Sequence, residues 1–168
     1  VGRAGAGFAG AIHSLHQQDV IHLDVKPSNV IMKRDGTAVL VDFGFAHHAR
    51  YPDLLAEETS FAAGSAPYVS PEQILGTRED PRSDVFSLAI VLWELLTGQF
   101  IVPRGDAVAA MRMIRDGKLE PLSQVAPHVP PSLVDAIMWG LETKREPRAT
   151  AQGLAQALEA FIKQSPEL

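Results

Sequence analysis

The polar residues best suited to chemistry lie in one short loop and shortly after it. Asp24, Lys26 and Asn29 stand around a proline, and Asp42 precedes a Phe-Gly pair. Carboxylate and amide oxygens are ligands that hard cations prefer, and a lysine beside them places positive charge in the same loop. The alternative is that both aspartates are ordinary loop residues that cap turns.

A second motif that could bind phosphate lies near the start of the chain. Residues 5–10 match the pattern G-x-G-x-x-G. A dinucleotide-binding loop of this kind needs a strand before it, and other glycine loops need a following strand that carries a lysine. Too few residues precede the pattern for a strand, and the next lysine, Lys26, lies in an irregular loop. We therefore predict a helix start that is rich in small residues.

The elements that must position these residues follow from periodicity and turn signals. Residues 9–18 are typical of the second half of a helix, because apolar residues recur at helical spacing. Residues 20–29 are expected to be irregular, since a proline blocks helix continuation. Residues 30–33 and 38–42 are β-rich runs joined by an Asp-Gly turn, which predicts a β-hairpin. Residues 43–68 lack periodicity and predict a long loop.

Four more helices are predicted in the second half of the chain. Residues 83–97 form a helix with Ser83 as N-cap and a glycine after its end. This helix is apolar nearly all round, which predicts that it is buried. Asp106, Ser132 and Thr150 are expected to cap the other three helices. The fold class is therefore mainly α, an α+β unit with one β-hairpin.

Composition narrows the classes of function. The chain has 168 residues and a net charge of −5, which fits one domain and lacks the basic excess of a nucleic-acid-binding surface. The absence of cysteine excludes disulfides and thiol nucleophiles. The longest apolar stretch, residues 88–96, is interrupted by Glu94 and is too short to span a membrane. Trp93 and Trp139 are assigned to the core. The histidines without metal-ligand spacing are expected to be surface or packing residues: His13, His16, His47, His48 and His128.

Five motifs occur in the order in which protein kinases carry them: His22-Leu23-Asp24-Val25-Lys26-Pro27-Ser28-Asn29, Asp42-Phe43-Gly44, the run from Gly64 to Glu72, Ser83-Asp84-Val85-Phe86-Ser87-Leu88 and Pro147-Arg148. They resemble the catalytic loop, the metal-binding motif, the end of the activation segment, the central helix and the arginine that pairs with the A-P-E glutamate in that family. The chain is similar to the C-terminal lobe of eukaryotic-like (Hanks-type) serine/threonine protein kinases, and most like bacterial members. The resemblance covers residues 1–168, with residues 42–72 as the activation segment.

The resemblance implies ATP and Mg²⁺ as cofactors and a protein as substrate. It implies that Asp24 accepts or orients the substrate hydroxyl, and that Lys26 places positive charge near the transferring phosphoryl group. Asn29 and Asp42 are expected to supply oxygens to Mg²⁺. Ile31 is expected to lie beneath the adenine as an apolar floor.

Other motif residues are expected to be structural. His22 and Phe43, which precedes Gly44, are expected to stack in an apolar column, and Asp84 to cap backbone groups of the catalytic loop. Glu72, in the place of the A-P-E glutamate, is expected to pair with Arg148.

The resemblance also favours the serine/threonine class. Lys26 is typical of that class, and Ser65 stands where its members keep a hydroxyl that bonds to the catalytic Asp and Lys. Leu23 replaces an arginine that reads an activation-loop phosphate. We therefore expect that phosphorylation of Thr59 or Ser60 is not the main activating switch. Two further departures are expected to be minor: Ala89 for Gly and Ser70 for Ala.

The resemblance covers only one half of the protein kinase domain. The glycine-rich loop, the lysine strand and the lysine's glutamate partner are absent from the sequence. We therefore expect negligible kinase activity from this chain alone, because catalysis depends on reactants held in near-attack geometry. An uncovered face where the N-terminal lobe would sit favours a homodimer. The expected location is the cytoplasm, as a protein or as part of a longer one.

Two other functions remain open. The chain could be a non-catalytic, stand-alone kinase-like C-lobe that acts as a protein-binding or dimerisation scaffold. A small-molecule kinase that shares this lobe is less favoured, because residues 65–72 resemble a segment that serves protein substrates. The coding sequence upstream of Val1 discriminates the first two hypotheses, since a glycine loop and a lysine strand there favour the enzyme.

Overall fold

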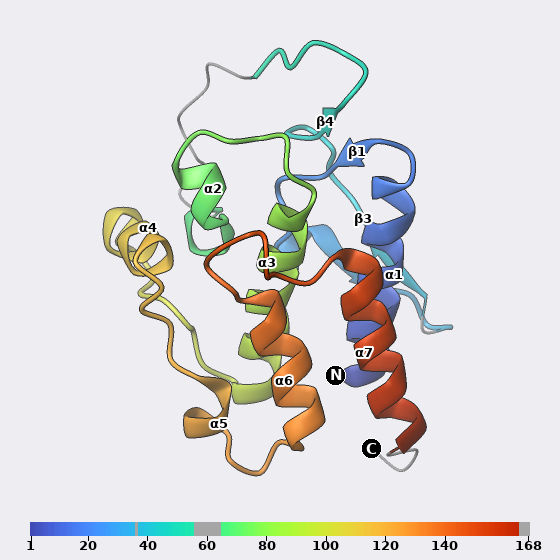
Figure 1. Ribbon diagram of the computed structural model, residues 1–168, viewed down its shortest axis with the longest axis vertical. Helices are drawn as coiled ribbons and strands as arrows, with labels where there is room; N and C mark the ends of the chain where they lie inside the picture. Colours follow the sequence, from blue (N-terminus) through green and yellow to red (C-terminus); the bar gives the residue numbers. More distant parts are fainter. Residues whose placement is uncertain (36, 56–64, 165–168) are drawn as a thin grey trace.

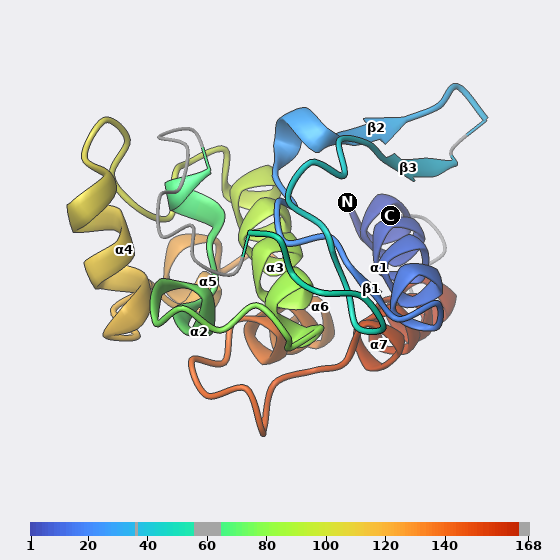
Figure 2. The same cartoon turned by 90° about the horizontal axis from the view of Figure 1, so that it is seen from above.

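The computed structural model describes residues 1–35, 37–55 and 65–164. Helices are the main elements of this part, and two small antiparallel sheets lie against α1 (Figures 1 and 2). The helices are α1 (Gly2–His16), α2 (Pro71–Ile74), α3 (Arg82–Thr97), α4 (Ala107–Arg115), α5 (Leu122–Val125), α6 (Pro131–Gly140) and α7 (Ala151–Gln164). The strands are β1 (Val20–Ile21), β2 (Val30–Met32), β3 (Ala38–Leu40) and β4 (His47–His48), with 3₁₀ turns η1 (Pro27–Asn29) and η2 (Ala66–Tyr68).

Helix α3 is the centre of the core. It is buried from Ser83 to Trp93, as its apolar sequence predicts, and it packs against α1, α6 and α7. Gly98 ends the helix in the left-handed conformation, with φ of 66°, which glycine adopts without steric cost. The predicted N-cap is wrong, because the helix begins at Arg82 with Pro81 before it. The Ser83 hydroxyl is buried and donates to Glu72 instead.

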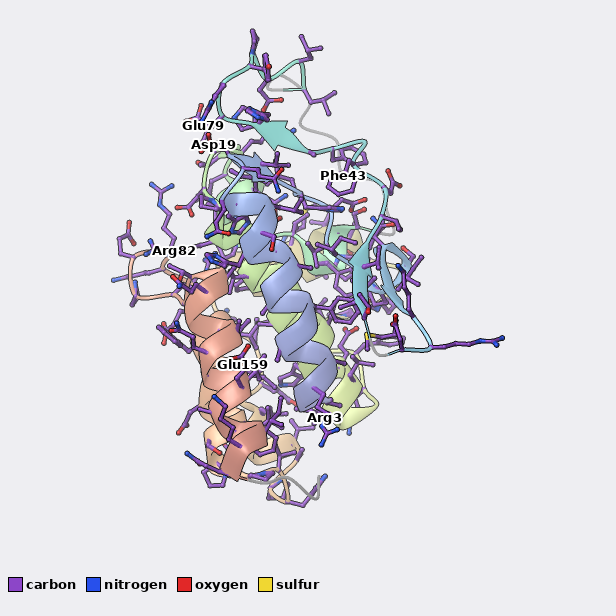
Figure 3. The ribbon with its side chains drawn as sticks, turned by 90° about the vertical axis from the view of Figure 1, so that its right-hand side faces the viewer. Arg3, Asp19, Phe43, Glu79, Arg82 and Glu159 are labelled. Atoms are coloured by element: carbon purple, nitrogen blue, oxygen red, sulfur yellow. The ribbon has the colours of Figure 1, made fainter. Side chains whose placement is uncertain are left out.

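Helices α1 and α7 lie side by side, and Gly2 near the start of α1 lies close to Phe161 near the end of α7 (Figures 1 and 3). The glycine motif at residues 5–10 lies inside α1, which confirms a helix rich in small residues rather than a phosphate loop. Gly5 has a packing role here. A Cβ at that position would stand 3.0 Å from Leu92 of α3 and 3.2 Å from Leu158 of α7, so the small residue lets three helices meet.

The predicted hairpin is confirmed, with slightly shorter strands. Strands β2 and β3 pair antiparallel, with Ile31 opposite Val39. A second sheet is new: β1 pairs with β4, with Val20 opposite His48. It lies in segments predicted to be irregular, because two-residue strands are too short to show alternation. This pairing ties the end of α1 to the segment after Asp42.

The cap predictions are confirmed at two of the remaining three helices. The Asp106 side chain accepts from the Ala109 N–H at the start of α4, and the Thr150 hydroxyl accepts from the Gly153 N–H at the start of α7. Ser132 is not a cap, because α6 begins at Pro131. The core assignment of the tryptophans is half right. Trp93 is buried, whereas Trp139 is 41% exposed.

No helix of the described ranges is both long and apolar enough to cross a membrane.

Candidate active site

A buried carboxylate of α3 fastens the loop that carries Asp24. The Asp84 oxygens accept from the backbone N–H groups of His22 at 2.9 Å and Leu23 at 2.8 Å. Leu23 has a φ of 61°, which costs energy for a residue other than glycine, so the loop needs such an anchor. His16 of α1 adds a third contact, with its Nε2 2.9 Å from Asp84 Oδ2. Asp84 thus holds the loop in a strained shape.

Asp24 lies at the centre of a polar cluster drawn from two distant parts of the chain. The Ser65 hydroxyl donates to Asp24 Oδ1 at 2.8 Å and accepts from Lys26 Nζ at 2.8 Å. Lys26 Nζ also lies 3.0 Å from Asp24 Oδ2. Asn29 Nδ2 donates to the same oxygen at 3.0 Å and to the Asp24 carbonyl at 2.9 Å. Because Asp24 is only 6% exposed, these contacts hold its side chain in one orientation.

The histidine of this loop is oriented by the backbone on both sides of its ring. His22 Nδ1 accepts from the Asp24 N–H at 3.2 Å, and Nε2 lies 3.0 Å from the Val41 carbonyl. Since a carbonyl only accepts, Nε2 carries the proton. The Phe43 ring meets the His22 ring edge-on, with centroids 5.0 Å apart. The structure therefore brings together the two rings that the sequence expects to stack.

Asp42 and Asn29 retain oxygens that could bind a cation. Asp42 is exposed, and its Oδ1 accepts a hydrogen bond from the Gly44 N–H at 3.2 Å. Asn29 uses its Nδ2 group on Asp24, which leaves the amide oxygen out of those bonds. One carboxylate and one amide oxygen are a donor set that suits Mg²⁺. No group of three or more acidic or histidine ligands occurs among the described residues.

Three apolar side chains near this site are exposed. Ile31 and Met32 of β2 are 47% and 44% exposed, and Phe43 is 47% exposed. The hairpin that carries Ile31 stands along one edge of the lobe (Figure 2). Its role as a floor beneath adenine stays a prediction.

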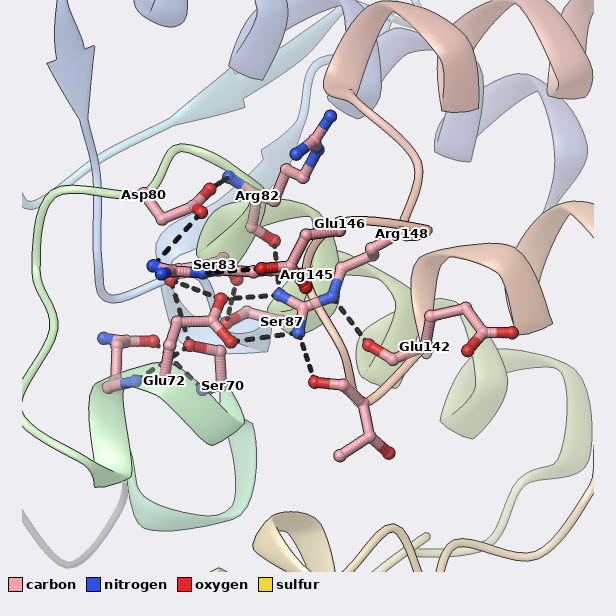
Figure 4. Close-up of polar contacts among 12 residues, drawn as sticks. Ser70, Glu72, Asp80, Arg82, Ser83, Ser87, Glu142, Arg145, Glu146 and Arg148 are labelled. Carbon is pink, nitrogen blue, oxygen red and sulfur yellow. Dashed lines mark hydrogen bonds and ion pairs between the residues drawn. The ribbon is translucent and has the colours of Figure 1, made fainter.

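Glu72 and Arg148 form a buried bidentate ion pair (Figure 4). Arg148 Nη1 lies 2.6 Å from Glu72 Oε1, and Nη2 lies 2.9 Å from Oε2. Burial raises the pKa of Glu72, but the hydrogen bond and charge of Arg148, with a bond from Ser83, outweigh it and lower the pKa. The Arg148 guanidinium also donates to three backbone carbonyls, those of Arg82, Glu142 and Thr143. The pair therefore joins α2, α3 and the segment before α7.

Ser70, which stands where an alanine is expected, has a structural role that the sequence does not reveal. Ser70 is fully buried and forms a capping box with Gln73 at the start of α2. Its hydroxyl also donates to the Ser83 hydroxyl at 3.0 Å. Gln73 Nε2 then donates to the Leu23 carbonyl at 3.0 Å, which connects α2 directly to the loop of Asp24.

A second polar cluster lies beside η2, and nothing in the sequence pattern predicts it. The Tyr68 hydroxyl donates to Glu94 at 3.0 Å, and Arg104 Nη2 lies 2.6 Å from the same carboxylate. Burial and the Glu94 charge raise the pKa of Tyr68 to about 12, although Arg104 opposes them. The guanidinium also lies over the Phe100 ring, 4.2 Å from its centroid. This cluster joins η2 to α3 and to the segment before α4.

The residues expected not to act as a phosphorylation switch, Thr59 and Ser60, lie outside the described residues. Leu23, which is expected to replace a phosphate-binding arginine, is 7% exposed.

Comparison with known proteins gives a consistent family. The protein kinase domain family matches residues 4–158. A probable serine/threonine-protein kinase of Clostridium perfringens is 36% identical over 98% of the chain, and serine/threonine-protein kinase PknL of Mycobacterium tuberculosis is 31% identical over 92%. Tyrosine-protein kinase MasK of Myxococcus xanthus is 31% identical over 87% of the chain. The chain spans 24%, 39% and 22% of the lengths of these relatives, respectively.

Proposed function

The chain belongs to the protein kinase family, and on that premise we propose that it is the C-terminal lobe of a serine/threonine protein kinase that transfers the γ-phosphoryl group of ATP to protein hydroxyls. The observation that carries the proposal is the Ser65 hydroxyl set between Asp24 and Lys26. It joins the carboxylate that would meet the substrate hydroxyl to the lysine that would meet the phosphoryl group. The matched family and the serine/threonine kinases among its relatives support the same assignment.

Each residue of the site has one proposed role in phosphoryl transfer. Asp24 is held by Ser65, Lys26 and Asn29, so its carboxylate can orient a substrate hydroxyl and take its proton as the phosphoryl group is transferred. Lys26 offers positive charge where negative charge develops on the phosphoryl oxygens. Mg²⁺ would supply charge neutralisation on the phosphates, with Asn29 and Asp42 as its protein ligands. Anchoring by Asp84 keeps the loop in place while the hydroxyl reacts.

The class of acceptor hydroxyl rests on Lys26 and Ser65. Two of the three relatives above are named serine/threonine kinases, and one is named a tyrosine kinase. We assign serine and threonine acceptors, because the Lys26–Ser65–Asp24 arrangement follows the pattern typical of that class. Identification of the phosphorylated amino acid decides between the two classes.

The proposal also assigns the chain to one lobe of the kinase domain. Among the described residues, each sheet has two strands, and the glycine motif near the start lies within α1. Neither feature can cover the phosphates of ATP in the way that a glycine-rich loop does. We therefore propose that residues 1–168 need contacts from an N-terminal lobe for activity. A cytoplasmic location remains a prediction.

The exposed apolar side chains favour a second candidate, a protein-binding or dimerisation lobe. Ile31 and Met32 are exposed on β2, and Phe43 is exposed directly after Asp42. If another lobe does not cover them, a second copy of the chain is the expected partner. Light scattering at high concentration tests this, since a clean monomer contradicts self-association.

The test of the enzyme compares two proteins. One is the 168-residue chain, and the other is the product expressed with the coding sequence upstream of Val1. We expect the longer product to phosphorylate a general acceptor protein on serine or threonine. The Asp24→Asn variant should lose about a hundredfold or more, in keeping with a general base. Phosphotyrosine alone, or an Asp24→Asn variant with full activity, contradicts the proposal.

A further inference from the structure

A large cleft of the described residues is separate from the cluster around Asp24. It has a volume of about 520 Å³ and lies where the end of α1, the start of α3 and the start of α7 meet. Its lining includes His16, Arg82, Arg145 and Thr150, and none of the residues assigned above to substrate or metal. The cleft therefore needs an explanation of its own.

Arg82 presents an unused cation to this cleft. Its Nε is buried and has no hydrogen-bond partner in the described part of the chain. In the same part, no carboxylate lies within ion-pair distance of its guanidinium. Its backbone N–H, by contrast, donates to Asp80 at 2.9 Å. Figure 4 shows the side chain pointing away from the Glu72–Arg148 pair. A buried donor without a partner costs free energy, and within the described part of the chain no acceptor removes that cost at Arg82 Nε.

The surroundings of Arg82 supply further donors. The Thr150 hydroxyl accepts from the Gly153 N–H, which leaves its own proton free to donate. The N–H groups of Ala151 and Gln152, which precede Gly153 at the start of the 14-residue helix α7, have no acceptor within the helix. Arg145 is 44% exposed in its side chain, and its ion-pair contacts with Asp80 and Glu146 are long, both at 3.6 Å. Its guanidinium can therefore turn toward a ligand.

Two carboxylates line the same cleft and limit where an anion can bind. Glu79 lies near the surface, where solvent screens its charge. Asp80 is occupied by the Arg82 N–H and by Arg145. His16 completes the lining, and its Nε2 is committed to Asp84. The position between Arg82 and the start of α7 is therefore the part of the cleft where donors outnumber acceptors.

We propose that this cleft binds a phosphate group, with Arg82 as the principal ligand and Thr150 and the start of α7 as further donors. A guanidinium fork matches phosphate oxygens in geometry as well as charge. The phosphate could belong to a small metabolite or to a phosphorylated side chain, and both offer the same chemistry. The inference does not depend on the proposed kinase activity.

Calorimetric titration of the 168-residue chain with inorganic phosphate tests the proposal, with sodium chloride adjusted to keep the ionic strength constant. We expect saturable binding that Arg82→Met weakens at least about tenfold, because the fork supplies both charge and paired donors. Arg82→Lys should bind with intermediate strength, because it keeps the charge and loses the fork. Arg34→Met, on an exposed turn, should bind like the unchanged protein. A phosphoserine peptide that binds more tightly than inorganic phosphate identifies a side chain as the source, and weaker binding identifies a small metabolite.

Further variants keep the test decisive. If Arg82→Met fails to fold, as judged by circular dichroism, Arg145→Met should weaken binding severalfold. The proposal is overturned by the absence of saturable binding, by equal binding in Arg82→Met, or by loss of binding in Arg34→Met.

Discussion

The buried pair of Glu72 and Arg148 permits the sharpest test of how this fold is stabilised. In Arg148→Met, the aliphatic part of the side chain is largely kept, while five hydrogen bonds are removed. Two of these bonds neutralise the Glu72 carboxylate, and three satisfy backbone carbonyls. The variant therefore leaves a charge without its partner inside the protein.

The size of the effect follows from that uncompensated charge. Removing one partner of a buried ion pair costs about 3–5 kcal/mol, whereas a domain is stable by only about 5–15 kcal/mol. Arg148→Met should therefore lose roughly 3–5 kcal/mol of unfolding free energy. The double variant Glu72→Met, Arg148→Met removes both charges and should be less destabilised than the sum of the two single variants.

Urea unfolding followed by circular dichroism measures these differences. Arg145→Met is the matched control, because Arg145 is 44% exposed in its side chain and its ionic contacts are long, at 3.6 Å. We expect that control to change stability by about 0.5 kcal/mol or less. A loss below about 1 kcal/mol in Arg148→Met would refute the reasoning, since surface pairs cost that little.

The same pair predicts how stability depends on pH. The pKa of Glu72 is lowered in the folded protein from its ordinary 4.5, so the unfolded chain binds the proton more readily. The stabilisation is thus present above pH 4.5 and is lost as the pH falls through the lower folded value. In Arg148→Met, burial is no longer outweighed by the guanidinium. The stability gap between the two proteins should therefore narrow below pH 4.5, and a gap that widens there contradicts the assignment.

Two further predictions test packing and the cluster beside η2. In Gly140→Ala a new Cβ would stand 2.7 Å from the Ala89 Cβ, so the protein should lose about 1–3 kcal/mol in urea unfolding. In the control Gly10→Ala, the new Cβ has no neighbouring atom within 4 Å, and the better helix former should raise the free energy of unfolding by about 0.5–1 kcal/mol. Equal changes in the two variants contradict the packing argument. In Glu94→Gln the pKa of Tyr68 should fall from about 12 toward 10.0, because a neighbouring negative charge is removed. Titration followed by ultraviolet absorbance measures this pKa, and a higher pKa in the variant would overturn the prediction.

The long elements of the fold could be predicted because their signals are local. Helices α1, α3, α4, α6 and α7 and the hairpin of β2 and β3 all follow from periodicity, caps and turn residues. The errors lie at short elements and at ends. The β1–β4 sheet has too few residues for a pattern. Ser83 has the chemistry of an N-cap, but a buried acceptor, Glu72, takes its hydroxyl.

The exposure of Trp139 and the roles of Ser70 show a related difficulty. Trp139 has a core-like side chain, yet its indole N–H donates to the Pro147 carbonyl while much of its surface remains exposed. Ser70 differs from the family pattern by one hydroxyl, which the fold uses in a buried network. Burial depends on what packs against a residue, and a single chain segment does not contain that information.

By itself the sequence determined the family resemblance and that Asp24, Lys26 and Asn29 share one short loop, from which their chemistry is predicted. Only the tertiary structure decided how these groups are held. Ser65 reaches Asp24 across 41 positions of sequence, and Arg148 reaches Glu72 across 76. Such contacts form when α3 is buried and the surrounding segments close over it. They depend on the packing of the whole lobe, which local spacing cannot specify.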